Sequence, residues 1–352
     1  MSKQLKWAVT FLTVVGSVLL LIILLVVVVD PFFRYHKPIK NFPYVVDDQL
    51  SQNPGMAKNM KYNSVILGSS VTMGFETKWF DELFGLDTIK LNYNGAYPKD
   101  QANIMEVVFE SDNTVETVFL GIDPYPYSAN VNDTKFPIPQ YLYTNTILDD
   151  SRYIFNKEVL VDYILAPLLS PDKKTDLSSV YKLNLEDGHY GAAQAVHAYT
   201  PAKIVGKNLA FDSFDKGVTD NMKVNILPFI ENNPDTEFVV FYSPYSILFW
   251  NDMIREGRLE ATIREVEVIS DLLFEYDNVT VYSFLGEEEI VTDLSNYADS
   301  VHFHSKVNRY MTECFANGIN IISEDNLDKE LQEIYEMAST YPFKEKFGLS
   351  IE

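Results

Sequence analysis

The first strong pattern along the chain is an unbroken apolar run near its start. The 23 residues from Trp7 to Val29 carry no charge and end in LLLIILLVVVV. A helix needs about 20 apolar residues to cross the roughly 30 Å hydrocarbon core of a bilayer. The run therefore predicts a transmembrane anchor after a short tail over residues 1–6, with a buried core helix as the alternative. The residues DPFF follow it in place of the small residues of a signal-peptide cleavage site, so we expect no cleavage.

The charges beside the apolar run are nearly balanced and do not orient it. Lys3 and Lys6 precede it, and Arg34, Lys37 and Lys40 follow it. A short tail before a large domain is typical of a signal anchor, so we expect a single-pass protein of the cell membrane with its C-terminal domain outside the cytoplasm. In the juxtamembrane segment, residues 30–61, four aromatic residues either anchor the outer interface or pack on the domain: Phe32, Phe33, Tyr35 and Tyr44.

Beyond residue 61, short β-branched runs alternate with longer helical patterns. This alternation is typical of a mostly parallel sheet with helices on both faces. The predicted strands are 64–67, 88–91, 118–121, 238–242 and 279–284, and the predicted helices are 99–110, 217–231, 253–276, 306–317 and 326–337. The pattern predicts an α/β domain over residues 62–320, a flavodoxin-like three-layer sandwich with a five-stranded, mostly parallel sheet. A helical extension over residues 321–352 follows.

One stretch, at about 125–219, is far longer than a crossover between two parallel strands requires. It is rich in tyrosine and follows the third predicted strand. Ligands of open α/β sheets bind at the carboxyl ends of the strands, so this insertion could serve as a lid or a substrate wall. A structural subdomain that packs on itself is an equal alternative.

Composition excludes several classes of function. Asp and Glu outnumber Lys and Arg by 50 to 28, for a net charge of −22, so the chain as a whole repels nucleic acid. It contains no phosphate-binding loop, no G-x-G-x-x-G, no H-E-x-x-H, no cysteine cluster and no calcium-loop pattern. We therefore expect no cofactor and no metal.

The segment SVILGSSVTMGF, residues 64–75, is the most informative for chemistry. A β-branched strand runs into Gly68, Ser69 and Ser70, and a helix follows. A serine at such a turn has an exposed hydroxyl and lies near the positive end of a helix dipole, which suits a nucleophile and an oxyanion. A simple helix cap would also explain a serine here.

A second segment, NYADSVHFHS at residues 296–305, supplies a candidate acid and base. Asp299 and His302 are three residues apart, so the carboxylate can hold one imidazole nitrogen and leave the other free. His304 is an alternative base, but no carboxylate precedes it at the same spacing. A surface aspartate beside a satisfied histidine is the alternative for the pair.

Taken together, the two segments resemble the SGNH/GDSL hydrolase family across residues 62–320. Gly68, Ser70, Thr72 and Gly74 match its first block, and Asp299 with His302 matches its last. The resemblance implies that Ser70 is the acyl nucleophile, that His302 is the base and that Asp299 orients it. The tethered layout is similar to that of a membrane-anchored bacterial branch, the proteins that act in O-acylation of cell-wall polymers and exopolysaccharides.

The chain departs from that family in its other blocks. Ser69 replaces the first-block acid, and Gly95 is a loose match to the second-block glycine, with Asn92 or Asn94 as a further amide donor. The resemblance implies an oxyanion hole formed by Ser70, Gly95 and a third-block asparagine, but Asp123 stands at that third position. An ionised carboxylate there would repel a developing oxyanion, whereas an Asp-Pro turn is the plain structural explanation.

These observations predict a membrane-anchored serine esterase or O-acyltransferase that acts on an acylated glycan or cell-wall polymer. The alternative is a catalytically inactive SGNH-like subunit that binds glycan or assists assembly beside a membrane-bound O-acyltransferase. The changed residue at position 123 is the main support for this alternative.

Overall fold

The computed structural model describes residues 1–176, 180–181 and 189–349, and these form two compact units. Unit 1 comprises Met1–Met60, Glu110–Asp112 and Ile138–Val180. Unit 2 comprises Lys61–Phe109, Asn113–Pro137 and Tyr181–Glu352. The expected insertion at 125–219 and the expected extension over 321–352 each include a few residues outside the described set. The middle of the expected insertion lies in unit 1 and its two ends lie in unit 2.

A six-stranded sheet in the order β2-β1-β3-β4-β5-β6 forms the centre of unit 2. The first five strands are parallel, and β1 pairs with β3 from Ser64 opposite Thr117 to Leu67 opposite Leu120. The expectation of a mostly parallel α/β sheet is confirmed, but the expected count of five strands is wrong because a two-residue strand pairs antiparallel with β5. The strands are β1 (Ser64–Leu67), β2 (Thr88–Lys90), β3 (Thr117–Ile122), β4 (Glu237–Tyr242), β5 (Val279–Ser283) and β6 (Ile321–Ile322).

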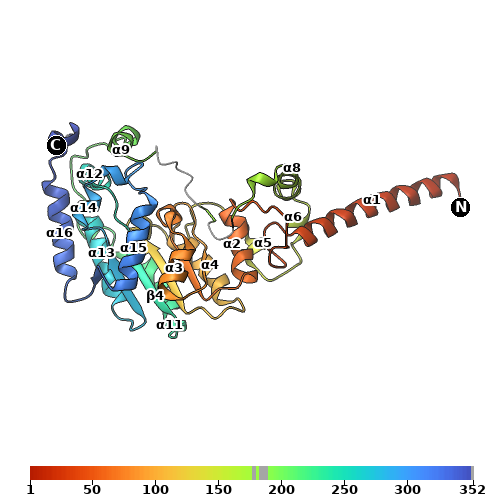
Figure 1. The fold of residues 1–352 in the computed structure, drawn as a ribbon, viewed down its shortest axis with the longest axis horizontal. Helices are drawn as coiled ribbons and strands as arrows, with labels where there is room; N and C mark the ends of the chain where they lie inside the picture. Colours follow the sequence, from red (N-terminus) through yellow and green to blue (C-terminus); the bar gives the residue numbers. More distant parts are fainter. Residues whose placement is uncertain (177–179, 182–188, 350–352) are drawn as a thin grey trace. The chain divides into compact units, whose positions relative to one another are not determined.

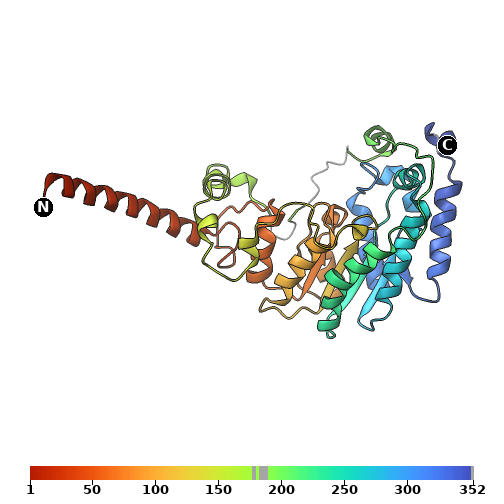
Figure 2. The same cartoon turned by 180° about the vertical axis from the view of Figure 1, so that it is seen from behind.

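Helices cover both faces of this sheet, which gives three layers (Figures 1 and 2). One face carries α3 (Thr77–Phe84) and α15 (Ser305–Asn317). The other carries α4 (Pro98–Phe109), α10 (Asp215–Asn221), α11 (Leu227–Asn232) and α13 (Leu259–Leu273). The remaining helices of unit 2 are short or peripheral: η1 (Ser70–Gly74), η2 (Pro126–Ser128), α9 (Ala192–Ala198), η7 (Met222–Ile226), α12 (Ile247–Arg255), α14 (Glu288–Val291), η8 (Leu294–Asn296), α16 (Leu327–Thr340) and α17 (Phe343–Phe347).

Two of the expected helices differ from the observed ones. The helix expected over 253–276 is two helices, α12 and α13, because Gly257 at φ +64° turns the chain between them. A Cβ on Gly257 would lie 2.9 Å from the backbone of Lys207 and Asn208. The helix expected over 217–231 contains a π-helical turn, η7, directly before the Pro228 turn that starts α11.

Unit 1 contains the apolar helix α1 (Lys3–Val29). Among the described residues, α1 alone is long and apolar enough to cross a membrane, by criteria that a signal sequence also meets. Phe32, Phe33 and Tyr44 are buried within unit 1, so they pack on the protein. The other helices of this unit are α2 (Gln49–Asn59), α5 (Gln140–Tyr143), α6 (Ser151–Ile154), α7 (Lys157–Leu160), η3 (Val161–Leu165), α8 (Ala166–Leu169) and η4 (Pro171–Lys173).

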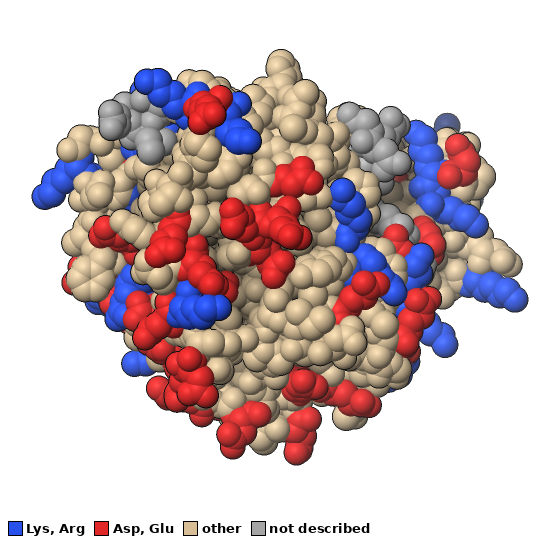
Figure 3. All heavy atoms as spheres, turned by 60° about the vertical axis from the view of Figure 1, so that its left-hand side comes forward, with Lys and Arg blue, Asp and Glu red and all other residues tan. Residues whose placement is uncertain are grey.

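The acidic charge of the chain belongs almost entirely to unit 2. Unit 1 has ten Lys and Arg against eleven Asp and Glu, whereas unit 2 has 18 against 39. Figure 3 shows clusters of acidic side chains spread over one face of the molecule. The two units therefore differ in how they respond to an anionic surface, which attracts cations and repels acidic side chains.

Candidate active site

Ser70 is presented by a tight turn between β1 and the 3-10 helix η1. Gly68 adopts φ +146°, and a Cβ there would lie 2.5 Å from Cγ2 of Thr72. Ser69 is extended and Ser70 begins η1, so the Ser70 N–H has no acceptor within that helix. The turn lifts the partly exposed Ser70 hydroxyl above the carboxyl edge of the sheet.

Three buried polar side chains hold this turn in place. The Thr72 backbone N–H and hydroxyl both donate to the Ser69 carbonyl, at 3.1 and 2.7 Å. The Asn92 amide donates to the same carbonyl at 3.4 Å and to the Thr72 hydroxyl at 3.1 Å. From α15, the Asn308 amide donates to the Val71 carbonyl at 3.1 Å. The amide of Asn92 thus supports the turn.

Ser70, His302 and Asp299 form a continuous hydrogen-bonded relay. The Ser70 Oγ lies 2.8 Å from His302 Nε2, and His302 Nδ1 lies 2.7 Å from Asp299 Oδ2. A carboxylate on Nδ1 fixes the tautomer that leaves Nε2 as the proton acceptor. The structure therefore brings together, from segments 232 residues apart, the three side chains that the sequence singled out.

The Asp299 carboxylate is anchored by the backbone of its own loop. Its Oδ1 accepts from the N–H groups of Val301 and His302, each at 2.8 Å. Burial would raise the pKa of Asp299, but the hydrogen bonds from His302 and Val301 outweigh burial and hold that pKa below its ordinary value. Asp299 is thus kept as an anion facing the imidazole.

His304, the alternative base, has a structural position. Its Nδ1 accepts from the Lys306 N–H at 3.0 Å at the start of α15, and its ring packs on Tyr190 with centroids 4.7 Å apart. These contacts give His304 a helix-capping role and leave the hydrogen-bonded relay to His302.

A pocket of about 390 Å³ opens beside Ser70 at the carboxyl edge of the sheet. Loops that follow five parallel strands reach this edge, and β1 lies where the strand order reverses, the usual ligand position in such sheets. The lining residues are Ser69, Ser70, Val71, Gly95, Ala96, Tyr97, Asp123, Tyr125, Pro126, Lys135, Tyr245, Phe249, Asp252, Met253, Glu256, Arg258 and Val301.

Of the expected oxyanion residues, Ser70, Gly95 and Asp123 all line this pocket. Gly95 adopts φ +61° beside the Lys135 side chain. Asn94 is exposed, and neither it nor Asn92 is among the lining residues. The structure therefore keeps the glycine and the aspartate at the pocket and removes both asparagines from it.

Asp123 is held by two hydroxyl groups. Tyr245, which follows β4, donates its hydroxyl to Oδ1 of Asp123, and Ser69 also hydrogen-bonds the carboxyl. Burial raises the pKa of Asp123 above its ordinary value, although both hydrogen bonds act in the opposite direction. The environment thus favours the neutral carboxyl more than water does.

Several pocket residues were missed by sequence reasoning. Tyr245 follows a buried strand with no motif around it, and Arg258 follows the unexpected break at Gly257. The Arg258 guanidinium packs on the rings of Tyr125 and Phe214, 4.9 and 5.1 Å from their centroids. Only the tyrosine-rich composition of the expected insertion pointed toward such contacts.

Within the residues that the structure describes, no group of three or more His, Cys, Asp or Glu side chains could hold a metal ion. The Ser70 hydroxyl lines the pocket and the His302 imidazole bonds to it, a pair of groups that is chemically suited to nucleophilic attack and proton transfer.

Comparison with known proteins gives little further information. No protein-family model matches the chain, and no curated protein matches it. A solved structure described as a candidate platelet activating factor from Streptococcus pneumonia is similar over 79% of this chain and 91% of its own. The sequence identity is 10% and the TM-score is 0.38. A likeness of this size decides nothing about function, which rests on the geometry of the site.

Proposed function

We propose that this protein is a membrane-anchored serine esterase or O-acyltransferase that acts outside the cytoplasm on an acylated glycan or cell-wall polymer. The observation that carries the proposal is the relay from Ser70 through His302 to Asp299, with both hydrogen bonds at 2.8 Å or less, at the mouth of a pocket. A hydroxyl in this arrangement is activated by the adjacent base.

In the first half-reaction, the Ser70 Oγ attacks the ester carbonyl and gives its proton to His302 Nε2. Asp299 stabilises the imidazolium that forms, because its carboxylate faces Nδ1. The tetrahedral intermediate then collapses, the ester C–O bond breaks, and His302 returns the proton to the departing alcohol. The acyl group remains on Ser70 as an ester.

In the second half-reaction, His302 takes a proton from the acceptor hydroxyl, which attacks the acyl-enzyme carbonyl. Collapse of this intermediate returns the proton to Ser70 Oγ. Water as the acceptor gives hydrolysis, and a sugar hydroxyl gives acyl transfer. Product analysis with and without an added polyol distinguishes these two outcomes.

Three groups at the pocket are assigned to the oxyanion. The N–H of Ser70 begins a 3-10 helix, Gly95 supplies a backbone N–H at the same pocket, and Asp123 in its neutral form supplies a hydroxyl donor. Each donor that faces the developing charge usually lowers the activation barrier by about 3–4 kcal/mol. The raised pKa of Asp123 supports this assignment.

The substrate class rests on the lining of the pocket, on α1 and on the SGNH/GDSL resemblance. Tyr97, Tyr125 and Phe249 offer flat apolar faces of the kind on which sugar rings stack. An anchor of the length of α1 places such a site beside polymers assembled at the membrane. A membrane-bound O-acyltransferase is the partner that the layout favours, and nucleic acid is disfavoured by the charge of −22.

Fluorophosphonate labelling of the full-length chain in detergent tests the proposal, because this reagent requires an activated serine but no known substrate. We expect the wild type to label and Ser70→Ala and His302→Ala to lose labelling by about 10³-fold or more. His304→Ala is the matched control, since it removes a nearby histidine outside the relay and should keep the label.

Absence of wild-type labelling in a folded chain would contradict an enzymatic role. The observation that favours the second candidate, an inactive glycan-binding or assembly subunit, is the acid at position 123 in the pocket wall. That candidate predicts glycan binding that survives Ser70→Ala unchanged, which calorimetric titration with acylated oligosaccharides would detect.

A further inference from the structure

Unit 1 exposes an apolar helix face that nothing in the described chain covers. The continuous helix α7-η3-α8 presents four side chains on one side, and we refer to them as the apolar face: Val161, Leu165, Leu168 and Leu169. Their exposed fractions are 41, 49, 53 and 84%. Residues spaced by three and four positions share one side of a helix, so these side chains form one stripe.

The other side of the same helix is fixed to the end of α1. Val159 and Ile164 are fully buried in a cluster with Val26 and Val29, the last turn of the apolar anchor. The charged residues Lys157, Glu158 and Asp162 lie in the first half of the helix, while its last turns are apolar. The apolar face is therefore held beside the point where α1 ends.

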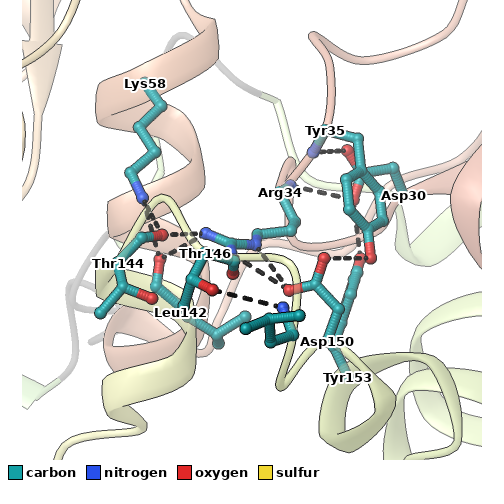
Figure 4. A network of polar contacts seen from close by, with 10 residues as sticks. Asp30, Arg34, Tyr35, Lys58, Leu142, Thr144, Thr146, Asp150 and Tyr153 are labelled. Carbon is teal, nitrogen blue, oxygen red and sulfur yellow. Dashed lines mark hydrogen bonds and ion pairs between the residues drawn. The ribbon is translucent and has the colours of Figure 1, made fainter.

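A second exposed apolar element is tied to the same place. Ile147 and Leu148, 74 and 92% exposed, form the tip of a loop in unit 1. Arg34, five residues after α1, donates to the Thr146 carbonyl at 2.7 Å and to Asp150 at 3.1 Å, and so fixes both sides of this tip (Figure 4).

Asp30 adds further hydrogen bonds to this network at the end of α1. It accepts from the backbone N–H groups of Arg34 and Tyr35 at 2.9 and 2.7 Å and from the Tyr153 hydroxyl at 2.8 Å (Figure 4). It also accepts from the backbone N–H of His36 at 2.9 Å. Arg34 and Asp150 are both buried, with side chains 5% exposed. A buried, fully paired network of this kind is rigid, so the loop tip and α1 move together.

The direction of the helix agrees with a position in an interface. In Figure 1, α1 runs across the view while the helix that ends in α8 is seen nearly end-on, so the two axes cross. A helix that crosses the axis of a membrane-spanning helix lies along the membrane plane. Apolar faces of such helices enter the boundary between headgroups and acyl chains by about 5–10 Å.

We propose that the apolar face and the Ile147–Leu148 tip insert into the interfacial layer of the bilayer that α1 crosses, so that unit 1 binds a phospholipid surface. The proposal rests on α1 being a membrane anchor. With ten basic and eleven acidic residues, unit 1 is nearly neutral and is not repelled by an anionic membrane, unlike unit 2.

Lipid quenching of single-cysteine variants tests this directly. Cys314 is buried and is the only cysteine of the chain, so Cys314→Ala provides the background. In it, Leu169→Cys and Leu148→Cys each carry an environment-sensitive fluorophore, in the full-length chain in phosphatidylcholine nanodiscs brominated near the headgroup or near the chain end. Val18→Cys, at the centre of the apolar run, tests whether α1 lies in the hydrocarbon core. Lys216→Cys in unit 2, whose side chain is 87% exposed, is the control for a probe in water.

We expect shallow bromines to quench the probes at 169 and 148, deep bromines to quench the probe at 18, and neither to quench the probe at 216. Quenching at 18 with none at 169 and 148 overturns the proposal and leaves the anchor standing. A blue-shifted but unquenched probe at 169 also overturns it, because a protein then covers the face. No quenching at 18 refutes the anchor itself, and fluorophosphonate labelling reports separately on the active site.

Discussion

Asp123 stands where the SGNH/GDSL resemblance implies an asparagine. Its carboxyl lies in the pocket wall beside Ser69, and Tyr245 donates to it. Burial raises its pKa, so the carboxyl keeps its proton to higher pH than a free aspartate. A neutral carboxyl can donate to an oxyanion as an amide does, whereas an ionised one repels it.

Replacing Asp123 by asparagine distinguishes the effect of its neutral carboxyl from the effect of its ionised carboxylate. We expect Asp123→Asn to raise kcat/KM by about tenfold at pH values above the raised pKa of Asp123, where the ionised carboxyl opposes the oxyanion, and to change kcat/KM little below that pKa. The wild-type rate relative to the variant falls as pH rises through the raised pKa. Identical pH–rate profiles for the two proteins would show that the carboxyl is turned away from the reacting atoms.

The stability of the folded wild-type protein should show the same direction of pH dependence as its rate, because both fall when Asp123 ionises. Because the folded pKa of Asp123 lies above its unfolded value, the native state loses stability as pH rises between the two values. The melting temperature of Asp123→Asn should therefore exceed that of the wild type by more at about pH 8 than at about pH 4. Thermal unfolding across pH measures this difference, and a constant offset would contradict it.

Asp299 should show the opposite pH dependence. Its folded pKa is lowered, so its stabilising contribution is present above the unfolded value and is lost as pH falls through the folded value. We expect Asp299→Asn to lower kcat by about 10³–10⁴-fold at neutral pH, because the imidazole loses its orienting anion. The melting temperatures of variant and wild type should differ at about pH 4 and above and should converge only as pH falls through the lowered folded pKa of Asp299, and a gap that persists below that pKa would argue against the ion pair.

At the residue scale, sequence reasoning singled out the residues whose contacts depend on short spacings. Asp299 and His302 are three residues apart, and Ser70 lies in a recognisable strand-to-helix turn. It failed where a role depends on packing, because Asn92 points into the serine turn and Tyr245 reaches Asp123 from another strand. No local pattern encodes either contact.

The turn between β1 and η1 is the element on which presentation of Ser70 depends. Gly68→Ala adds a Cβ 2.5 Å from Thr72 at φ +146°, which should cost roughly 1–3 kcal/mol of stability and displace Ser70. Gly85→Ala is the matched control, since Gly85 also has a positive φ, +72°, but has no atom within 4 Å of the added Cβ.

We expect Gly85→Ala to lower stability by about 1–2 kcal/mol and to keep fluorophosphonate labelling, whereas Gly68→Ala loses the label while still folded. Denaturant unfolding and labelling on the same samples measure both effects. Equal labelling of the two variants would mean that the turn tolerates displacement.

Elements with strong periodicity were predicted well and short or broken ones were not. The five parallel strands consist of β-branched and aromatic runs that are recognisable in the sequence. Strand β6 has only two residues and depends on pairing with β5. The break at Gly257 looks like an ordinary helical glycine in the sequence. In the structure it is left-handed, and the approach of the chain at Lys207 and Asn208 leaves no room for a Cβ.

For the whole molecule, the division into units was the feature furthest from sequence reasoning. Unit 1 joins the juxtamembrane segment to residues 138–180, more than 70 residues farther along the chain. The partners that hold it together, Arg34 and Asp150, are 116 residues apart. Spacing patterns carry no information about a pairing at that distance, whereas periodicity already indicated the sheet of unit 2.

This arrangement makes the end of α1 part of the core of unit 1. Val26 and Val29 are buried there, and each buried valine contributes about 1.5–3 kcal/mol. A chain that begins at Pro31 lacks both valines and Asp30, whereas one that begins at Leu24 keeps all three. We expect the shorter chain to lose residues 138–176 to limited proteolysis faster and still to label at Ser70.

Mass spectrometry of the proteolytic fragments measures that difference. Equal protection of residues 138–176 in both chains would show that unit 1 is stable without the last turn of α1. Loss of Ser70 labelling in both would mean that the reactivity of Ser70 depends on residues 1–23, which both chains lack.

The discontinuous course of unit 1 bears on how proteolysis could separate unit 2 from α1. The chain passes between the two units at residues 60–61, 109–110, 112–113, 137–138 and 180–181. A protease that cuts only after residue 60 leaves unit 2 covalently joined to residues 138–180, which Arg34 and the apolar cluster still hold to the fragment that contains α1. A single cut there therefore nicks the protein without releasing unit 2, and release requires further cuts on both sides of residues 138–180 or the unfolding of unit 1.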